Sequence, residues 1–258
     1  MSVRSKRPDG YHNLETCFYP VPWTDVLEII PGDKFTFTTT GIAILGDAEE
    51  NLCVKAYRIL EKDFNLTPVK IHLHKIIPSG AGLGGGSSDG AHTLRLLDTI
   101  FSLRISQERL MDYAAKLGSD CAYFIQDSVM IGSGRGEILT GISLTLKGKF
   151  VVIVKPEIHV STKDAFEGIV PQMPQSGIRE ILLRYPVAQW KDFLKNDFEE
   201  PVFRKHPVLK ILKDKLYRLG ATYASMTGSG SAIVGIFESV VDISDKFPGA
   251  VCWSGVMD

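Results

Sequence analysis

The chain has 258 residues, of which 44% are hydrophobic and 23% are charged, as in an ordinary globular protein. This length is enough for one large domain or two medium ones, each with a proper core. Lysine and arginine number 29 against 30 aspartate and glutamate residues, which leaves a formal net charge of -1. This near-neutral charge gives no reason to expect nucleic acid or an anionic membrane as a partner.

The cysteines and the apolar runs limit where the protein is expected to act. Cys17, Cys53, Cys121 and Cys252 are scattered without a close pair, so neither a disulfide framework nor a zinc site is indicated. No apolar run approaches the roughly 20 residues that span a bilayer, and the N-terminus lacks the apolar core of a signal peptide. The sequence therefore predicts a cytoplasmic protein with reduced thiols.

The first motif in chain order is a turn near the N-terminus. Pro8, Asp9 and Gly10 have turn chemistry and place Tyr11 and His12 just beyond the turn. From composition alone, a surface turn with an incidental aromatic pair is the simpler interpretation.

Two strands and a helix are predicted next. Residues 26–30 and 34–40 have strand patterns, and the turn at residues 31–33 between them predicts a β-hairpin. Residues 51–64 have apolar side chains at helical spacing, with Asn51 as the expected N-cap.

The most informative stretch is a glycine-rich run, residues 78–90, which reads PSGAGLGGGSSDG. It follows the strand pattern of residues 69–77 and precedes the helix pattern of residues 91–102. Glycines let a backbone approach an anion closely, and the helix start adds N–H groups and the positive end of its dipole. The run is therefore predicted to bind phosphate. The predicted binding residues are Pro78, Ser79, Gly80, Ala81, Gly82, Leu83, Gly84, Gly85, Gly86, Ser87 and Ser88.

Several details restrict the kind of phosphate loop. Ser87 and Ser88 are expected to act either as N-caps or as ligands of a phosphate oxygen or a metal, and Asp89 suits the first helical turn. The run is no P-loop, because no Lys-Ser or Lys-Thr follows its last glycine, and it lacks the acidic residue of a dinucleotide fingerprint. A flexible linker is the alternative, but a strand and an amphipathic helix do not normally bracket a linker.

Metal binding has weak support in the sequence. His72 and His74 share one face of the strand before the loop, but no third ligand lies nearby, so a solvent-facing sheet surface is the simpler interpretation. No metal-ligating residue is predicted.

An aspartate follows the next predicted helix. Residues 107–117 form this helix, which stops at Gly118, and Asp120 comes just before an apolar stretch. Asp120 is either the cap of a further helix or a partly buried carboxylate with a chemical role. Residues 132–137, GSGRGE, form a second glycine-rich turn for which we predict no chemistry.

The last third of the chain contains a buried strand, a capped helix and another glycine loop. Residues 150–154 are continuously apolar, as in a buried strand, and Ser161 or Thr162 is expected to cap a helix. Residues 227–231, TGSGS, either bind phosphate or simply reverse the chain.

The run 78–90 resembles the second motif of the GHMP kinases, the family of galactokinase, homoserine kinase, mevalonate kinase and phosphomevalonate kinase. Residues 227–231 are similar to the third motif, which packs beside the nucleotide loop. Leu-Gly-Ser-Asp, which ends at Asp120, is similar to the segment whose aspartate is the proposed base. The resemblance implies ATP and Mg²⁺ as cofactors and transfer without a covalent phospho-enzyme.

The resemblance also implies the fold class, α+β, with two domains. The N-terminal domain, residues 1–148, is expected to hold a mixed sheet with helices, like ribosomal protein S5, and to bind ATP. The C-terminal domain, residues 149–258, is expected to be a smaller α/β domain, with the active site between the two.

Residues 6–16, KRPDGYHNLET, resemble the N-terminal signature of one branch of this family, which phosphorylates the 2-hydroxyl of CDP-methylerythritol in the non-mevalonate isoprenoid pathway. In that branch the tyrosine and histidine hold the cytidine end, so Tyr11 and His12 inherit this role; an aromatic face and an imidazole suit a pyrimidine. Thr162 and Phe166 are further candidate contacts. The expected partner is this small molecule, with no nucleic acid and no membrane, for a monomer or a homodimer.

The resemblance fails at the start of the chain. Family members open with a strand carrying Ala-Lys-Ile/Leu-Asn-Leu, whose lysine faces the catalytic aspartate, and Lys6 belongs to a different motif. Without that lysine we expect weakened catalysis, because it would lower the pKa of Asp120 and add positive charge at the phosphate. Without the strand we expect an open sheet edge. A start site placed too late or a shortened chain would account for the gap.

Two other functions stay open at this point. One is another GHMP kinase acting on a small alcohol such as mevalonate or homoserine, although neither has a base for Tyr11 and His12 to hold. The other is a nucleotide-binding protein without turnover.

Overall fold

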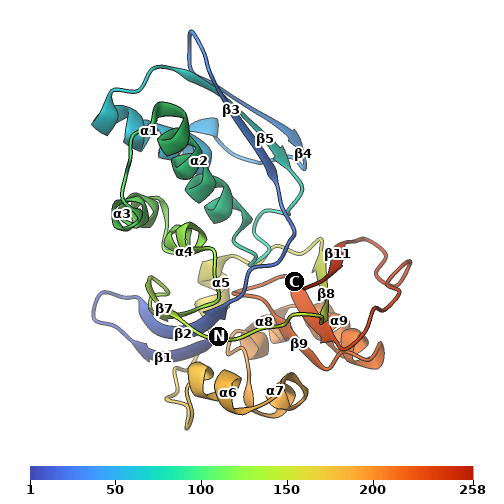
Figure 1. The fold of residues 1–258 in the computed structure, drawn as a ribbon. Helices are drawn as coiled ribbons and strands as arrows, with labels where there is room; N and C mark the ends of the chain where they lie inside the picture. The colour runs from blue at the N-terminus through green and yellow to red at the C-terminus, as the bar shows by residue number, and fades with distance from the viewer. Residues whose placement is uncertain (258) are drawn as a thin grey trace. The chain divides into compact units, whose positions relative to one another are not determined.

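The computed structural model describes residues 1–257, which form two compact units (Figure 1). One unit contains Met1–Pro22, Gly80–Leu83 and the chain from Val129 onward, and the other contains Trp23–Ser79 and Gly84–Ser128. We call them the first and the second unit. The chain passes between them four times, twice within the glycine-rich run.

The second unit contains a three-stranded sheet with the order β3-β5-β4. Its strands are β3 (Val26–Pro31), β4 (Thr36–Gly41) and β5 (Val69–Lys75). Strand β5 pairs antiparallel with β3 and parallel with β4. The predicted hairpin of residues 26–40 is therefore wrong, because β5 lies between its two strands. Val69, Ile71 and Leu73 of β5 are buried, and a central strand can pack such side chains better than an edge strand.

Helices complete the second unit, and α1 and α2 lie side by side against the sheet (Figure 1). Asn51 caps α1 as predicted, since its side chain accepts a hydrogen bond from the Cys53 N–H at 2.9 Å. The predicted helix 107–117 is confirmed and ends at Gly118. The helical elements are η1 (Ala48–Glu50), α1 (Leu52–Phe64), α2 (Gly85–Phe101), α3 (Gln107–Leu117) and α4 (Cys121–Gln126).

The first unit contains an antiparallel sheet with the order β1-β2-β6-β7. Its strands are β1 (Ser2–Lys6), β2 (His12–Phe18), β6 (Met130–Gly134) and β7 (Ile138–Gly141). Residues 2–6, for which no element was predicted, form β1 at the sheet edge, where pairing with β2 satisfies the backbone groups on the side that faces β2. The pairing of Leu14 with Gly134 places the β1–β2 and β6–β7 turns at the same end of the sheet.

A second antiparallel sheet of the first unit has the order β11-β8-β10-β9. Its buried strand β8 confirms the prediction for residues 150–154, and its side chains pack with Leu209 and Leu216 in one core. The strands are β8 (Phe150–Pro156), β9 (Tyr223–Met226), β10 (Ile233–Phe237) and β11 (Ala250–Val256). The helices are α5 (Thr162–Phe166), α6 (Ile178–Arg184), α7 (Val187–Phe193), α8 (Glu199–Lys205) and α9 (Pro207–Arg218).

These mixed sheets and helices have the predicted α+β character. The domain boundary between residues 148 and 149 was predicted from the family resemblance, whereas the two units are defined by contacts within the structure. The boundary therefore stays a prediction. All four cysteines are free thiols. Within residues 1–257, no helix has both the length and the apolar character needed to cross a membrane.

Candidate active site

Helix α2 begins inside the glycine run, at Gly85, and not at residue 91. Its N-cap is Gly84, which has a φ of 72°, and the Ser88 N–H donates to the Gly84 carbonyl at 2.9 Å. Ser87 and Ser88 therefore lie in the first helical turn, so of the two predicted alternatives the role as N-caps is wrong, and the role as ligands stays a prediction. Helical periodicity could not reveal this start, because the first six helical residues include three glycines and two serines.

Two glycines of the run have no room for a side chain. In the second unit, a Cβ atom on Gly84 would lie 2.8 Å from Cζ of Phe124. In the first unit, a Cβ atom on Gly82 would lie 2.3 Å from the carbonyl oxygen of Thr227. Both residues have a positive φ, 72° and 73°, so glycine is required on conformational grounds as well.

Residues 227–231 contact the part of the run that belongs to the first unit. The Thr227 hydroxyl donates to the Gly82 carbonyl at 2.8 Å, and the Ala232 N–H donates to the Ala81 carbonyl at 3.1 Å. The same segment reverses the chain, since the Gly230 N–H donates to the Thr227 carbonyl at 2.9 Å. The second glycine loop and Ala232 therefore hold residues 81 and 82 of the first glycine loop.

A buried lysine between two aspartates supports the loop in the second unit. Lys75 Nζ donates to Asp89 Oδ2 at 2.8 Å and also bonds Asp25, and all three side chains are almost fully buried. The other Asp25 oxygen accepts the N–H groups of Ile76 and Ile77 at 2.6 and 2.8 Å. Burial raises the pKa of Asp89 to about 6, and Lys75 opposes the rise.

This charged group was not found from the sequence, although a signal exists. In the alternating strand VKIHLHK, the buried side holds Val69, Ile71, Leu73 and Lys75. A lysine on the buried side of a strand needs an acidic partner, because an unpaired buried charge is costly. Asp89 was predicted to serve the helix dipole, but its carboxylate instead pairs with Lys75.

A cavity of about 210 Å³ lies within the second unit, next to the helical part of the glycine run. Gly86 faces open space there, since a Cβ atom added to it would have no neighbour within 4 Å. The cavity thus offers room beside the first turn of α2, where backbone N–H groups are free to bind an anion. Its lining residues are Ile44, Leu45, Gly46, Asp47, Glu50, Asn51, Leu52, Lys75, Ser79, Gly86 and Asp89.

Asp120 precedes α4 in the second unit, and its side chain makes no capping hydrogen bond. Its carboxylate has no hydrogen-bond or ion-pair partner within residues 1–257. Although Asp120 is exposed, the surrounding protein removes enough water to raise the pKa of its carboxyl group. Asp120 directly precedes α4, and the Phe124 ring of α4 lies against Gly84 at the start of α2. A free carboxylate of raised pKa suits a base, and the simple cap role is not observed.

The predicted substrate residues lie in the first unit. The His12 ring stacks on Phe166, with ring centres 4.7 Å apart and planes at 17°, and Phe166 packs edge-on against Phe198. Burial, and secondarily Lys6, lowers the pKa of His12, which favours a neutral imidazole with one donor and one acceptor.

Tyr11 and Thr162 are both exposed in the first unit. Ser161, not Thr162, caps α5: its hydroxyl oxygen accepts the Asp164 N–H at 3.0 Å. Thr162 is therefore the first residue of α5, and its hydroxyl does not serve as the cap.

His72 and His74, the pair considered for metal binding, bond to neighbouring threonines. The Thr38 hydroxyl lies 2.9 Å from Nδ1 of His72, and the Thr40 hydroxyl lies 2.9 Å from Nδ1 of His74. These contacts bridge strands β4 and β5 on the exposed side of the sheet.

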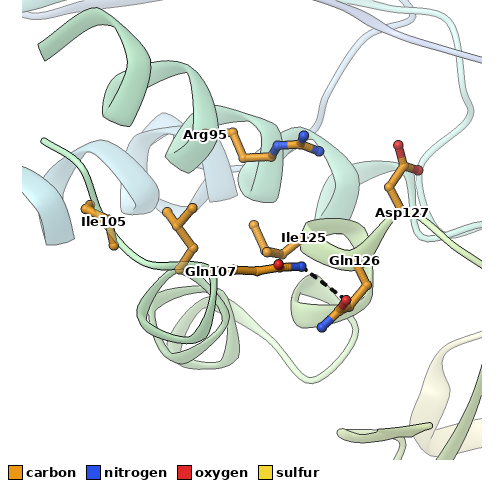
Figure 2. A pocket seen from close by; sticks show the side chains of 7 residues that line it. Arg95, Ile105, Gln107, Ile125, Gln126 and Asp127 are labelled. Carbon is orange, nitrogen blue, oxygen red and sulfur yellow. Dashed lines mark hydrogen bonds between the residues drawn. The ribbon is translucent and has the colours of Figure 1, made fainter. Parts of the chain in front are cut away.

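Another cavity, of about 370 Å³, lies among α2, α3 and α4 of the second unit (Figure 2). Gln107 and Gln126 hydrogen-bond each other at 3.2 Å beside it, and the charged side chains there are Arg95 and Asp127. No residue of the glycine run and no other predicted site residue lines it. It is therefore separate from the candidate active site.

Comparison of the sequence with models of protein families shows which family the chain belongs to. The model of the GHMP kinases N terminal domain matches residues 51–130, and the model of the GHMP kinases C terminal domain matches residues 186–248. Together these matches cover more than half of the chain. The chain belongs to the GHMP kinases.

The relatives within that family carry a particular name. A 4-diphosphocytidyl-2-C-methyl-D-erythritol kinase from Bacteroides thetaiotaomicron is 52% identical over 92% of this chain and 88% of its own. The enzyme of that name from Cytophaga hutchinsonii is 49% identical over 93% of this chain and 88% of its own. A crystal structure of 4-(cytidine 5'-diphospho)-2C-methyl-D-erythritol kinase matches with a TM-score of 0.78 and 30% identity, and covers 99% of this chain and 94% of that one.

Proposed function

We propose that this chain transfers the γ-phosphoryl group of ATP to the 2-hydroxyl of 4-diphosphocytidyl-2-C-methyl-D-erythritol. The observation that carries the proposal is the similarity to kinases named for this substrate, at 49% and 52% identity over more than nine-tenths of the chain. The rings of Tyr11, His12 and Phe166 support the choice of substrate, because mevalonate and homoserine have no base that such rings could hold.

The nucleotide is assigned to the glycine run, residues 78–88, and to the cavity beside Gly86. The glycines and the start of α2 direct N–H groups at the phosphates, and the helix dipole favours their negative charge. Lys75, held by Asp25 and Asp89, fixes the strand before the run and the helix after it. The start of α2 therefore needs little reorganisation when it binds the triphosphate.

Asp120 is assigned as the base. Its carboxylate takes the proton of the 2-hydroxyl while that oxygen attacks the γ-phosphorus, and the bond from the γ-phosphorus to the bridging oxygen of ADP breaks. The raised pKa of Asp120 makes it a better proton acceptor than an ordinary aspartate. Its freedom from protein partners leaves the carboxylate available to the substrate.

Mg²⁺ prefers oxygen ligands, and the second unit offers hydroxyl oxygens at Ser87 and Ser88 in the first turn of α2. These residues fit the ion by chemistry and would hold it together with the phosphates. When bound, Mg²⁺ neutralises charge that develops on the phosphate oxygens.

Tyr11, His12, Phe166 and Thr162 are assigned to the cytidine end of the substrate. The ring of Tyr11 supplies a stacking surface, and the neutral His12 imidazole supplies one hydrogen-bond donor and one acceptor for a pyrimidine edge. Phe166 holds the His12 ring in place by stacking on it.

The test measures ADP release by the full chain with ATP, Mg²⁺ and either 4-diphosphocytidyl-2-C-methyl-D-erythritol, mevalonate or homoserine. Release with the cytidyl substrate alone is expected. Release with mevalonate or homoserine instead would assign the chain to another small-alcohol kinase. ATP binding without release in any mixture would contradict the proposed activity and favour a nucleotide-binding protein without turnover.

A further inference from the structure

Two neighbouring turns at one end of the sheet β1-β2-β6-β7 contact each other through a cation and an aromatic ring. The β1–β2 turn carries Tyr11 and the β6–β7 turn carries Arg135. Because Leu14 pairs with Gly134 between β2 and β6, the start of β2 lies beside the end of β6. The guanidinium carbon of Arg135 lies 5.0 Å from the centre of the Tyr11 ring, within the range of a cation–π contact.

The Tyr11 ring has few other contacts that would fix its direction. Tyr11 is 56% exposed, and within residues 1–257 its hydroxyl group makes no hydrogen bond with the protein. Its backbone is fixed, since its N–H donates to Asp9 Oδ1 at 3.1 Å and its carbonyl accepts the Arg7 N–H at 2.8 Å. The guanidinium group of Arg135 therefore covers part of a ring that is otherwise open to solvent.

Arg135 is itself held in place by its own turn. The Glu137 carboxylate accepts the Arg135 backbone N–H at 2.5 Å and Nε at 3.4 Å. Gly134 and Gly136 flank Arg135 with φ values of 68° and 113°, which makes the turn tight. Because Glu137 already balances its charge, Arg135 is better suited to hold a ring than to attract a phosphate.

From this contact we infer that Arg135 is a positioning residue, which holds the Tyr11 ring in the orientation that stacks on the pyrimidine base of the substrate. The inference rests on the proposed function. It makes Arg135 a determinant of affinity for the cytidine end, without a role in phosphoryl transfer. The sequence alone assigned no chemistry to this arginine.

The experiment compares wild type with Arg135→Gln, Arg135→Lys, Tyr11→Ala and the double variant Arg135→Gln/Tyr11→Ala. Steady-state kinetics give kcat and the two KM values, and calorimetry with CDP gives a Kd that does not depend on turnover. We expect Arg135→Gln to raise KM for the cytidyl substrate and Kd for CDP about two- to fivefold, with kcat and KM for ATP unchanged. Arg135→Lys keeps a cation and is expected to restore most of the affinity.

The double variant distinguishes positioning from direct binding. If Arg135 acts through the ring, Arg135→Gln has no further effect on the Kd for CDP once Tyr11 is alanine. A matched control is Arg184→Gln, which removes a similar cation–π contact at a place with no assigned role. The guanidinium carbon of Arg184, at the end of α6, lies 5.4 Å from the centre of the Tyr185 ring. This control is expected to leave every constant unchanged.

Three results would overturn the inference. An unchanged Kd for CDP in Arg135→Gln would show that the contact does not matter. An equal loss in the Tyr11→Ala background would show that Arg135 binds the substrate directly. A wild-type chain that neither binds CDP nor uses the cytidyl substrate would overturn the proposed function as well, whereas the first two results would leave that function intact.

Discussion

At the scale of single residues, the chemistry assigned to Asp120 has a consequence for pH. The surrounding protein raises the pKa of Asp120 above its ordinary value of 3.8, and a base must be ionised to act. We therefore expect kcat/KM to fall as the pH drops through this raised pKa, so that the acidic limb of the profile lies above pH 3.8. The measurement is the dependence of kcat/KM on pH.

Asp120→Asn tests the same assignment directly. Loss of general-base catalysis is expected to lower kcat about 10²–10⁴-fold and to remove this acidic limb. Asp112→Asn, in an exposed aspartate of α3, is the control and is expected to keep the wild-type profile. Equal activity of the Asp120→Asn variant and the wild-type chain would contradict the role as base.

Gly86 offers a second test at the residue scale, because its side-chain position is open. Gly86→Ala meets no atom within 4 Å and lies in the first turn of α2, so the fold is expected to keep its stability or to gain up to about 1 kcal/mol. If the nucleotide fills the cavity, the added methyl group takes part of its space. We expect KM for ATP to rise about tenfold.

Gly141→Ala is the matched control for Gly86→Ala. Gly141 ends β7 and also has open space around the position of a Cβ atom. Thermal melting of both variants checks the fold, and initial rates at varied ATP give KM. An unchanged KM for ATP in Gly86→Ala would place the nucleotide elsewhere.

At the scale of elements, Lys75 joins strand β5, helix α2 and the segment before β3. Lys75→Met would leave Asp25 and Asp89 buried without a counter-charge, which is expected to lower the free energy of unfolding by about 3–5 kcal/mol. Lys210→Met, which breaks an exposed pair with Asp214 on α9, is expected to cost less than about 1 kcal/mol. Urea unfolding of the variants measures both values.

The loss caused by Lys75→Met is expected to depend on pH. Burial raises the pKa of Asp89 to about 6, so between its ordinary value of 3.8 and this value the folded state binds more protons, and the free energy of unfolding falls as pH rises. Removing Lys75 removes an opposing effect and raises the pKa further. The penalty should therefore be larger at pH 8 than at pH 5, and an equal penalty would contradict the pairing.

The same elements explain why parts of the site were visible in the sequence. Some roles depend only on residues that are near neighbours in sequence, so the local pattern was enough to predict them. These are the helix caps Asn51 and Ser161 and the helix stop Gly118. The start of α2 was missed because Gly85, Gly86, Ser87 and Ser88 have low helix propensity, and tertiary packing decided that they are helical.

At the scale of the whole molecule, the order of strands depended on contacts between distant segments. The local turn at residues 31–33 predicted a hairpin, but β5 lies between β3 and β4, so these two strands do not pair with each other. The Lys75 group and the Arg135–Tyr11 contact are equally non-local. Lys75 is 50 residues from Asp25 and 14 residues from Asp89 along the chain. Tyr11 and Arg135 lie on different hairpins.

The sequence by itself determined the α+β class and the family resemblance, and it predicted that the glycine run binds phosphate. These properties depend on residue type and short spacing, which act through backbone conformation and hydrogen bonds between near neighbours. Only the tertiary structure decided which strand is central, where α2 begins, that Lys75 is paired, and that Arg135 covers Tyr11. Burial and charge pairing set these features, and both depend on residues that come together only when the chain folds.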